Sequence, residues 1–419
     1  MSNSKLASFH KTLFGLAILI LITMSNTPSL ASADRTPSFV HLGSGNLVNE
    51  QGMAVYLDGV NYKDQLNWYL YEEEKAPDWS AIRGDFASMG SMGAKVVRVW
   101  FNWLNYERTP GGLNSVRLLS DMQKIVNIAK QNGLYVILTI YVYNVHFGRT
   151  YKVIAKNWLQ ADATSSKTDP NSSDFWLNNG DYPSRQRGLF VQLWRTISAS
   201  FKNEPTVAMY DLMNEPFNKY YDSLPLWVQN EPEHDSHYPL KSLFDQAISA
   251  IRGNGDNHLV LLDYNWVNGY VTFPAVRPST DPQVMYDVHL YYTAAETPTQ
   301  GWDIAARNYA PWSGRSMSGT SIAYTYPDTA SGHDISQLSS RFAGLVKLHE
   351  YAFYVGEFGF TENTVYSQDI ASLVAEFRLS GFAYFEYVPG YASLPDWPWG
   401  TVGSSNVTQT ILAKVRQAP

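Results

Sequence analysis

The chain has 419 residues, a formal net charge of −7 and no cysteine. The lack of cysteine excludes thiol catalysis, disulfides and cysteine metal sites, so the fold must rely on its hydrophobic core. An acidic chain with scattered charges is a poor partner for nucleic acid or for an anionic membrane surface.

Residues 1–33 have the layout of a secretory signal peptide. Lys5 and Lys11 give a positive start, an uncharged apolar run covers 13–22, and small residues at 31–33 form a cleavage site. The alternative is a membrane anchor, but the run is shorter than the roughly 20 residues that span a bilayer. We therefore expect a cleaved leader, no stable membrane insertion afterwards, and a secreted or periplasmic protein.

From about Val55 the sequence alternates short apolar runs with longer amphipathic stretches. The clearest helical pattern covers Leu118–Lys130, and Gly133 ends it before the next apolar run. Eight runs rich in valine, isoleucine and tyrosine predict strands at 54–62, 95–101, 135–142, 207–215, 258–264, 284–292, 353–360 and 382–388.

Eight alternations of strand and helix predict a parallel sheet with helical crossovers, closed into a (β/α)8 TIM barrel. We expect one such domain over residues 34–419, with long loops after strands three, four, six and eight. The alternative is an open doubly wound sheet. That fold favours a glycine-rich phosphate turn after the first strand, and the sequence "GVNYKDQ" is not one.

The tripeptide Asn-Glu-Pro occurs three times, with its glutamate at Glu204, Glu215 and Glu231. In an eight-fold barrel the active groups lie at the C-terminal ends of the strands and on the following loops. Glu204 lies between a helical pattern and a strand, which predicts the opposite face, with Pro205 ending the helix. Glu231 belongs to a loop on the correct face, where a carboxylate is usually solvated. Only Glu215 ends a predicted strand, so we expect it to be catalytic.

A second carboxylate is predicted on the seventh strand. Glu357 lies in an apolar run, flanked by Gly356 and Gly359. Burying a charge is costly unless the charge is paired or used in chemistry, so the alternative is a structural ion pair. Two carboxylates that face each other across a barrel mouth can cleave a glycosidic bond. We therefore expect Glu215 and Glu357 to form a catalytic pair.

The motifs "DLMNEPF" and "YVGEFGF", in this order on strands four and seven, resemble the signatures of glycoside hydrolase clan A, and of its cellulase- and mannanase-like family 5 most of all. The resemblance extends to "AKVVRVWFNW" and "DVHLYY" on strands two and six. It implies a retaining double displacement. Glu357 would be the nucleophile, and Glu215 would first donate a proton and then act as a base.

The resemblance also implies substrate-binding residues. Arg98 would lie beside the nucleophile and keep it charged. Asn214 would bind the sugar 2-hydroxyl. His289 and Tyr291 are two residues apart on one strand and so point the same way, and they would lie beside the acid and the nucleophile respectively.

Two positions depart from the family pattern. Where many members have a histidine at the end of strand three, this chain has Tyr141, with His146 further on, and the sequence leaves open which of them takes that role. On strand eight the usual tryptophan platform is missing. Phe385, Tyr387 or the tryptophans at 397 and 399 would replace it, so the substrate is not fixed.

We expect no metal and no cofactor, because the histidines of "EHDSH" at 233–237 have no matching ligands elsewhere. The sequence as a whole indicates a monomeric endo-β-glycanase whose partner is a polysaccharide or oligosaccharide of the β-1,4-mannan or β-1,4-glucan type. The alternatives are a catalytically inactive carbohydrate-binding barrel, a transglycosylase and a metal-dependent barrel hydrolase.

Overall fold

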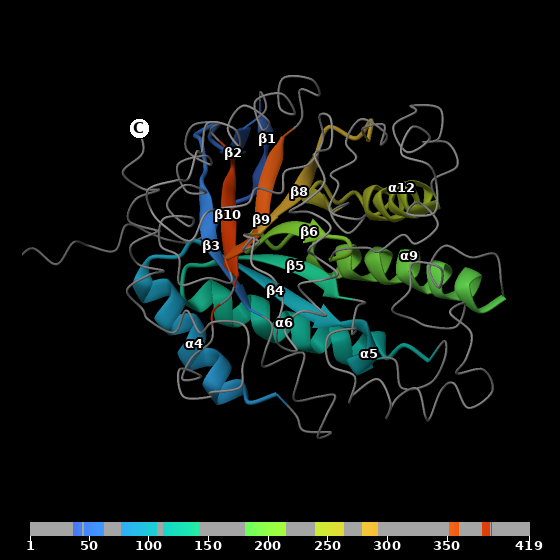
Figure 1. Ribbon diagram of the computed structural model, residues 1–419, viewed down its shortest axis with the longest axis horizontal. Helices are drawn as coiled ribbons and strands as arrows, with labels where there is room; N and C mark the ends of the chain where they lie inside the picture. Colours follow the sequence, from blue (N-terminus) through green and yellow to red (C-terminus); the bar gives the residue numbers. More distant parts are fainter. Residues whose placement is uncertain are drawn as a thin grey trace, which may run out of the picture. The chain divides into compact units, whose positions relative to one another are not determined.

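The computed structural model describes residues 37–43, 46–62, 77–106, 112–141, 181–214, 239–263, 279–291, 352–359, 379–385 and 387. By its internal contacts the chain divides into Met1–Thr36 and Pro37–Pro419. All the elements below belong to the second unit (Figure 1). The expected leader, including its cleavage site, lies outside the described residues.

Eight parallel strands form a closed barrel in the order β10-β3-β4-β5-β6-β7-β8-β9. This confirms the predicted (β/α)8 architecture and excludes the open doubly wound sheet. The strands are β3 (Leu57–Tyr62), β4 (Val96–Asn102), β5 (Tyr135–Tyr141), β6 (Val207–Asp211), β7 (Leu259–Asp263), β8 (Val284–Tyr291), β9 (Phe353–Gly359) and β10 (Gly381–Phe385).

Strand β6 is shorter than predicted, because it ends at Asp211 rather than at Glu215. The barrel wall nevertheless continues beyond it. The Leu212 N–H donates to Leu261 O at 3.2 Å, and the Asn214 N–H donates to Ile140 O at 2.9 Å. The backbone is therefore held as far as the residue before Glu215, and Glu215 itself lies outside the described residues.

The helices lie outside the strands, with α4 and α6 beside β3–β5 and with α9 and α12 packed on each other (Figure 1). Their bounds are α4 Trp79–Met92, α5 Trp103–Tyr106, α6 Ser115–Gln131, α9 Asp181–Phe201 and α12 Pro239–Arg252. Asp78 caps α4 by accepting the N–H groups of Ser80 and Ala81 at 2.9 and 3.0 Å. None of these helices is both long and apolar enough to cross a membrane.

Helix α6 confirms the prediction of a helix over Leu118–Lys130. Its apolar stripe, which includes Met122 and Ile125, is buried. Gly133 follows the helix with a φ of 64°, a left-handed conformation that glycine adopts readily. The helix therefore ends at Gln131, and three residues connect it to Tyr135, where β5 begins.

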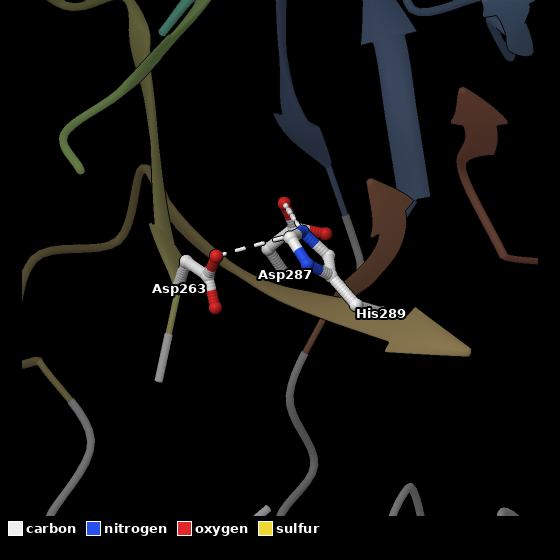
Figure 2. Close-up of side chains that lie close together, drawn as sticks. All are labelled: Asp263, Asp287 and His289. Carbon is white, nitrogen blue, oxygen red and sulfur yellow. Dashed lines mark hydrogen bonds and ion pairs between the residues drawn. The ribbon is translucent and has the colours of Figure 1, made fainter. Parts of the chain in front are cut away.

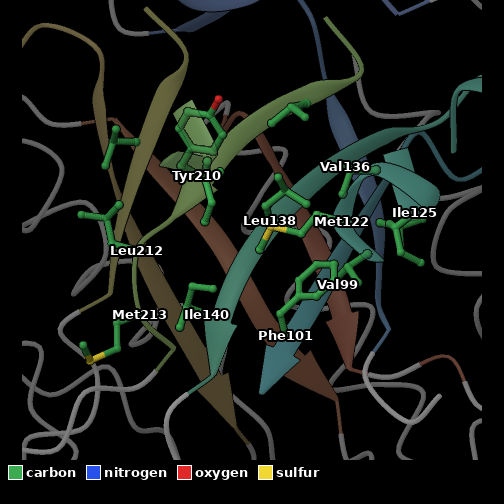
Figure 3. Close-up of a cluster of buried hydrophobic side chains, with 14 of the residues drawn as sticks. Val99, Phe101, Met122, Ile125, Val136, Leu138, Ile140, Tyr210, Leu212 and Met213 are labelled. Carbon is green, nitrogen blue, oxygen red and sulfur yellow. The ribbon is translucent and has the colours of Figure 1, made fainter. Parts of the chain in front are cut away.

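In the part of the chain that the structure describes, the hydrophobic core forms two clusters, which reflect the alternation of side chains along each strand. The outer cluster lies between strands and helices and contains Val99, Phe101, Leu138 and Tyr210 (Figure 3). The inner cluster, which we call the barrel floor, consists of inward-facing residues near the N-terminal ends of the strands. It includes Leu57, Val96, Ile137, Met209, Leu259, Met285 and Tyr354.

An antiparallel hairpin that the sequence analysis did not predict precedes the barrel. Its strands are β1 (Val40–Gly43) and β2 (Asn46–Asn49). Val40 and Leu47 join the barrel floor, and the Leu42 N–H donates to Gln283 Oε1 at 2.9 Å. The hairpin therefore covers the N-terminal end of the barrel, which leaves the C-terminal end for the polar groups.

Candidate active site

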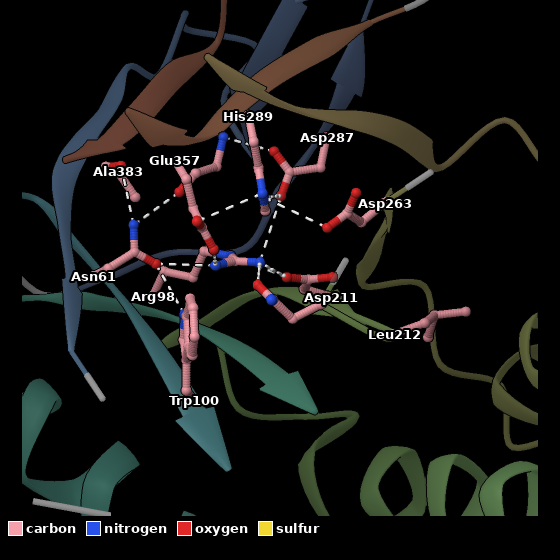
Figure 4. Close-up of polar contacts among 12 residues, drawn as sticks. Asn61, Arg98, Trp100, Asp211, Leu212, Asp263, Asp287, His289, Glu357 and Ala383 are labelled. Carbon is pink, nitrogen blue, oxygen red and sulfur yellow. Dashed lines mark hydrogen bonds and ion pairs between the residues drawn. The ribbon is translucent and has the colours of Figure 1, made fainter. Parts of the chain in front are cut away.

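A buried arginine organises the polar layer above the barrel floor. Arg98 on β4 has no exposed surface, and each of its five N–H groups has an acceptor (Figure 4). The partners are Asp211 Oδ2 at 2.9 Å from Nε and 2.6 Å from Nη2, Asn61 Oδ1 and Glu357 Oε1 at 2.9 Å from Nη1, and Asn214 Oδ1 at 2.8 Å from Nη2. One cation thus joins strands β3, β4 and β9 and the chain around the end of β6.

Glu357 on β9 lies between two basic side chains. Its Oε1 accepts from Arg98 Nη1 at 2.9 Å, and its Oε2 lies 3.5 Å from His289 Nδ1. The residue is only 2% exposed. Both basic groups favour the charged carboxylate, so the site holds an oriented anion at the C-terminal end of the barrel.

His289 on β8 faces three carboxyl groups. Its Nε2 lies 3.2 Å from Asp287 Oδ2 and 3.5 Å from Asp263 Oδ2. Figure 2 shows these three side chains close together. Burial by itself would lower the pKa of His289, but the charges of Glu357, Asp263 and Asp287 outweigh it and raise the pKa well above its ordinary value. Both ring nitrogens of His289 face carboxylates, and this arrangement favours the protonated imidazole.

Asp263, Asp287 and His289 could each offer one ligand atom to a metal, since these atoms lie within 4.8 Å of one another. A protonated imidazole has no free lone pair for a metal, and both ring nitrogens of His289 face carboxylates. We therefore interpret the three residues as a buried ion-pair group.

Asp211, at the end of β6, is the carboxyl group whose titration is most clearly altered. Burial raises its pKa to about 6, and nearby Asp287 adds to that effect, while Arg98 partly opposes it. Its Oδ1 is buried without a hydrogen-bond partner among the described residues. Among the described residues, the layer places two basic side chains, Arg98 and His289, against the carboxyl groups of four acidic residues.

Two asparagines complete the layer. Asn61 uses its full hydrogen-bonding capacity, because Oδ1 accepts from Arg98 and Trp100 while Nδ2 donates to Gly356 O at 2.8 Å and Ala383 O at 3.0 Å. Asn214 uses only its oxygen in the described part of the chain. Its Nδ2 is buried and has no partner there, so it is a donor that a ligand could use.

Aromatic rings lie on one side of this layer. Trp100 on β4 stacks on Tyr141 at the end of β5, with ring centroids 4.9 Å apart and an interplanar angle of 30°. Trp100 Nε1 donates to Asn61 Oδ1 at 2.9 Å, which fixes the ring beside Arg98. Tyr141 is the half-buried partner in this stack.

Tyr387 is not brought to this layer. Its ring packs beside Tyr62, in the outer cluster, at 6.4 Å between centroids. Its hydroxyl hydrogen-bonds with Ser88 of α4. The ring therefore faces the helix layer, which does not support the prediction that it forms a sugar platform.

The structure describes only some of the remaining predicted residues. Glu215, Glu231, His146 and the tryptophans at 397 and 399 lie outside the described residues. Tyr291 ends β8 and pairs with Gly359, but only its backbone is described. Glu204 lies in the turn between α9 and β6, as predicted, where Lys130 Nζ approaches its Oε2 at 3.1 Å.

Sequence reasoning missed Asn61, Asp211, Asp263 and Asp287. Each is a polar residue inside a buried strand, and each is fully buried. The argument that singled out Glu357, a charge placed in an apolar run, applies equally to these aspartates. The sequence therefore carries the same signal on strands β6, β7 and β8 as on β9.

Solved structures support the fold. Endo-glycoceramidase II from Rhodococcus sp., in a cellobiose-like imidazole complex, matches with a TM-score of 0.57 at 18% identity, over 89% of this chain and 81% of its own. Cel5A from Thermotoga maritima, in complex with mannotriose, matches with a TM-score of 0.55 at 17% identity, over 85% of this chain and 97% of its own. XacCel5A, in complex with cellopentaose, matches with a TM-score of 0.53 at 18% identity, over 86% of this chain and 99% of its own.

Sequence comparison extends the match from fold to family. The family model described as Cellulase (glycosyl hydrolase family 5) matches residues 48–392. The matched range contains every barrel strand and every residue of the polar layer. The chain therefore belongs to glycosyl hydrolase family 5 and is a glycoside hydrolase.

Proposed function

We propose that this protein is a secreted or periplasmic, retaining endo-β-glycanase that hydrolyses β-linked polysaccharide by double displacement. Glu357 attacks the anomeric carbon as the nucleophile. Glu215 donates a proton to the leaving oxygen and then removes one from water. The substrate is a β-1,4-mannan or a β-1,4-glucan.

The observation that carries this proposal is the setting of Glu357. Its carboxylate is held at 2.9 Å by Arg98 and faces His289 at 3.5 Å, in a site that is almost closed to water. A nucleophilic carboxylate must stay ionised and keep one orientation, and two basic neighbours favour both.

The position of Asn214 supports a role for Glu215. The Asn214 backbone is anchored to Ile140 O at the end of β5, and its side-chain oxygen accepts from Arg98. Glu215 is the next residue in the sequence, and the chain that leads to it is held in the polar layer as far as Asn214. Asn214 Nδ2, which has no partner among the described residues, suits a hydrogen bond to the sugar 2-hydroxyl, a contact that can strengthen in the transition state.

The first experiment is a substrate screen on purified protein lacking residues 1–33. The panel holds mannan, β-glucan, xylan, a bacterial exopolysaccharide and a glycosphingolipid, and product sizes are read by mass spectrometry. We expect oligosaccharides from mannan or glucan. Release of monosaccharide alone would contradict endo action, and cleavage of the glycolipid alone would contradict the polysaccharide assignment.

The second experiment follows the anomer of the first product by NMR. A retaining enzyme releases the β-anomer from a β-linked substrate, and mutarotation then forms the α-anomer. The α-anomer as the first product would exclude double displacement. Sugar transfer to an added acceptor in place of hydrolysis would identify a transglycosylase, and binding without any product would identify a carbohydrate-binding barrel.

A further inference from the structure

Strand β9 contains one residue more than its neighbours require. Val355 pairs with Val288 of β8, and the next pair joins Glu357 to His289, so Gly356 has no partner residue on β8. The pairing with β10 shifts at the same place, between Phe382 and Tyr384. Gly356 therefore forms a β-bulge immediately before Glu357.

The bulge decides which face of the barrel wall Glu357 occupies. Tyr354 belongs to the barrel floor and Val355 to the outer cluster, so a regular strand would turn residue 356 inward and residue 357 outward. Glu357 instead points inward, where its carboxylate contacts Arg98. The extra residue restores the inward direction by shifting the alternation by one position.

Side chains of two other strands hold the bulge. Gly356 N–H donates to Asp287 Oδ1 at 2.6 Å, and Gly356 C=O accepts from Asn61 Nδ2 at 2.8 Å. These bonds replace the ladder bonds that a bulge interrupts. A Cβ at position 356 would overlap the Asp287 carboxylate, so only glycine fits beneath it.

We propose that Asp287 and Asn61 are positioning residues that hold the Gly356 bulge and thereby aim Glu357 at the substrate. The proposal rests on the function proposed above, because it presumes that Glu357 is the nucleophile. Neither residue needs to touch the sugar. Asp287 acts through the Gly356 N–H, and Asn61 acts through the Gly356 carbonyl and through Arg98 Nη1.

The test compares Asp287→Ala, Asp287→Asn and Gly356→Ala on the substrate identified by the screen. Misplacement of a reacting group by about 1 Å can cost about 10²-fold in rate, so we expect Asp287→Ala and Gly356→Ala to lower kcat by about that factor. KM should stay within about threefold, because the change affects aim more than binding. Asp287→Asn keeps an oxygen that can accept the Gly356 N–H and should recover at least about tenfold of the loss.

The matched control is Asp256→Ala. Like Asp287, Asp256 is a buried carboxylate beside a histidine, and it lies 2.7 Å from His258 Nδ1. It also accepts a hydrogen bond from Tyr210 OH at 2.8 Å. It precedes β7, at the N-terminal end of the barrel, so it should lose stability but not kcat. A kcat for Asp287→Ala as high as that of Asp256→Ala would overturn the proposal.

Crystal structures of the wild type and of Asp287→Ala keep this test separate from the proposed function. We expect the variant to lose the pairing of His289 with Glu357 and the contact between Glu357 and Arg98. An unchanged β9 would overturn the positioning role even if the wild type cleaved no glycan, whereas that inactivity would overturn only the proposed function. If Asp287→Ala does not fold, Asn61→Ala tests the carbonyl side of the same bulge, with the same outcomes.

Discussion

Arg98 Nη1 donates at 2.9 Å to Glu357 Oε1 across a barrel interior that is closed to solvent around the guanidinium. The same guanidinium is held by Asp211, Asn61 and Asn214. The orientation of the proposed nucleophile is therefore part of the core that folds the barrel. A substitution at Arg98 should change stability and catalysis together.

Arg98→Lys should lower the free energy of unfolding by about 3 kcal/mol or more, because lysine keeps the charge but has three donors where Arg98 uses five, so at least two hydrogen bonds to buried acceptors are lost. Urea denaturation measures the loss. Lys130→Ala is the control, because it breaks the exposed pair with Glu204 and should cost less than about 1 kcal/mol. Equal losses for the two variants would contradict the central place of Arg98.

Glu357→Gln and Glu215→Gln should each lower kcat by about 10²-fold or more, since each removes a group that takes part in bond cleavage. Glu204→Gln is the matched control from the same tripeptide, and it should retain near wild-type kcat because Glu204 lies in the α9–β6 turn. Steady-state kinetics on the screened glycan decide the matter. A Glu231→Gln variant as inactive as Glu215→Gln would show that the wrong copy was chosen.

The stability of the protein should depend on pH through Asp211. Its pKa is raised from 3.8 to about 6 in the fold, so between these values the native state holds a proton that the unfolded chain has lost. The free energy of unfolding contributed by this group therefore falls as pH rises through that range, by up to about 1.4 kcal/mol per pH unit. Urea denaturation of wild type and Asp211→Asn at pH 4 to 6.5 should show their difference shrinking with rising pH.

The pH dependence of stability that comes from Asp256, which Asp256→Asn would remove, has the opposite sign to that of Asp211. Burial tends to raise the pKa of Asp256, but the hydrogen bond with His258 outweighs it and lowers the pKa. The stability that Asp256 contributes is present when the pH is above the ordinary pKa of an aspartate. It is lost as pH falls through the folded pKa. His289, whose pKa is also raised, resembles Asp211 in sign, and its contribution to stability is lost as pH rises through its folded pKa. If the difference in free energy of unfolding between wild type and Asp211→Asn grows with pH, the raised pKa of Asp211 is refuted.

Tyr387→Phe should leave KM for the glycan unchanged, because the ring packs beside Tyr62 and the hydroxyl contacts Ser88 of α4. The expected effect is a loss of stability of about 1 kcal/mol from the missing hydrogen bond. Initial rates over a range of substrate concentrations and a thermal melt measure the two quantities. A rise in KM of tenfold or more would restore Tyr387 as a sugar-binding residue.

The sequence was sufficient to predict the barrel, because its strands are apolar on both faces and its helices have an apolar stripe. The hairpin of β1 and β2 was missed, since four-residue strands with intermediate burial carry little periodic signal. The grouping of Arg98, Asn214, His289 and Glu357 followed from the family motifs. The direction of the Tyr387 side chain did not, because packing against α4 decides it.

The bulge at Gly356 could not be predicted from the pattern of the strand. "FYVGEFGF" reads as a continuous apolar run, and an inserted residue leaves no periodic trace where both faces are buried. Asp287 and Asn61, which bind the bulge, are distant in sequence from Glu357. Only the register of neighbouring strands shows that the three belong together.

The extra residue in β9 makes the length of a strand as important as its chemistry. Deleting one residue between Val355 and Glu357 would keep every functional group of the polar layer, yet it would turn the carboxylate toward the outer cluster. A relative that retains the glutamate but lacks one residue before it should therefore fold as a barrel and fail as a hydrolase. The spacing of residues along β9, and not only the identity of Glu357, should therefore decide whether this barrel is active.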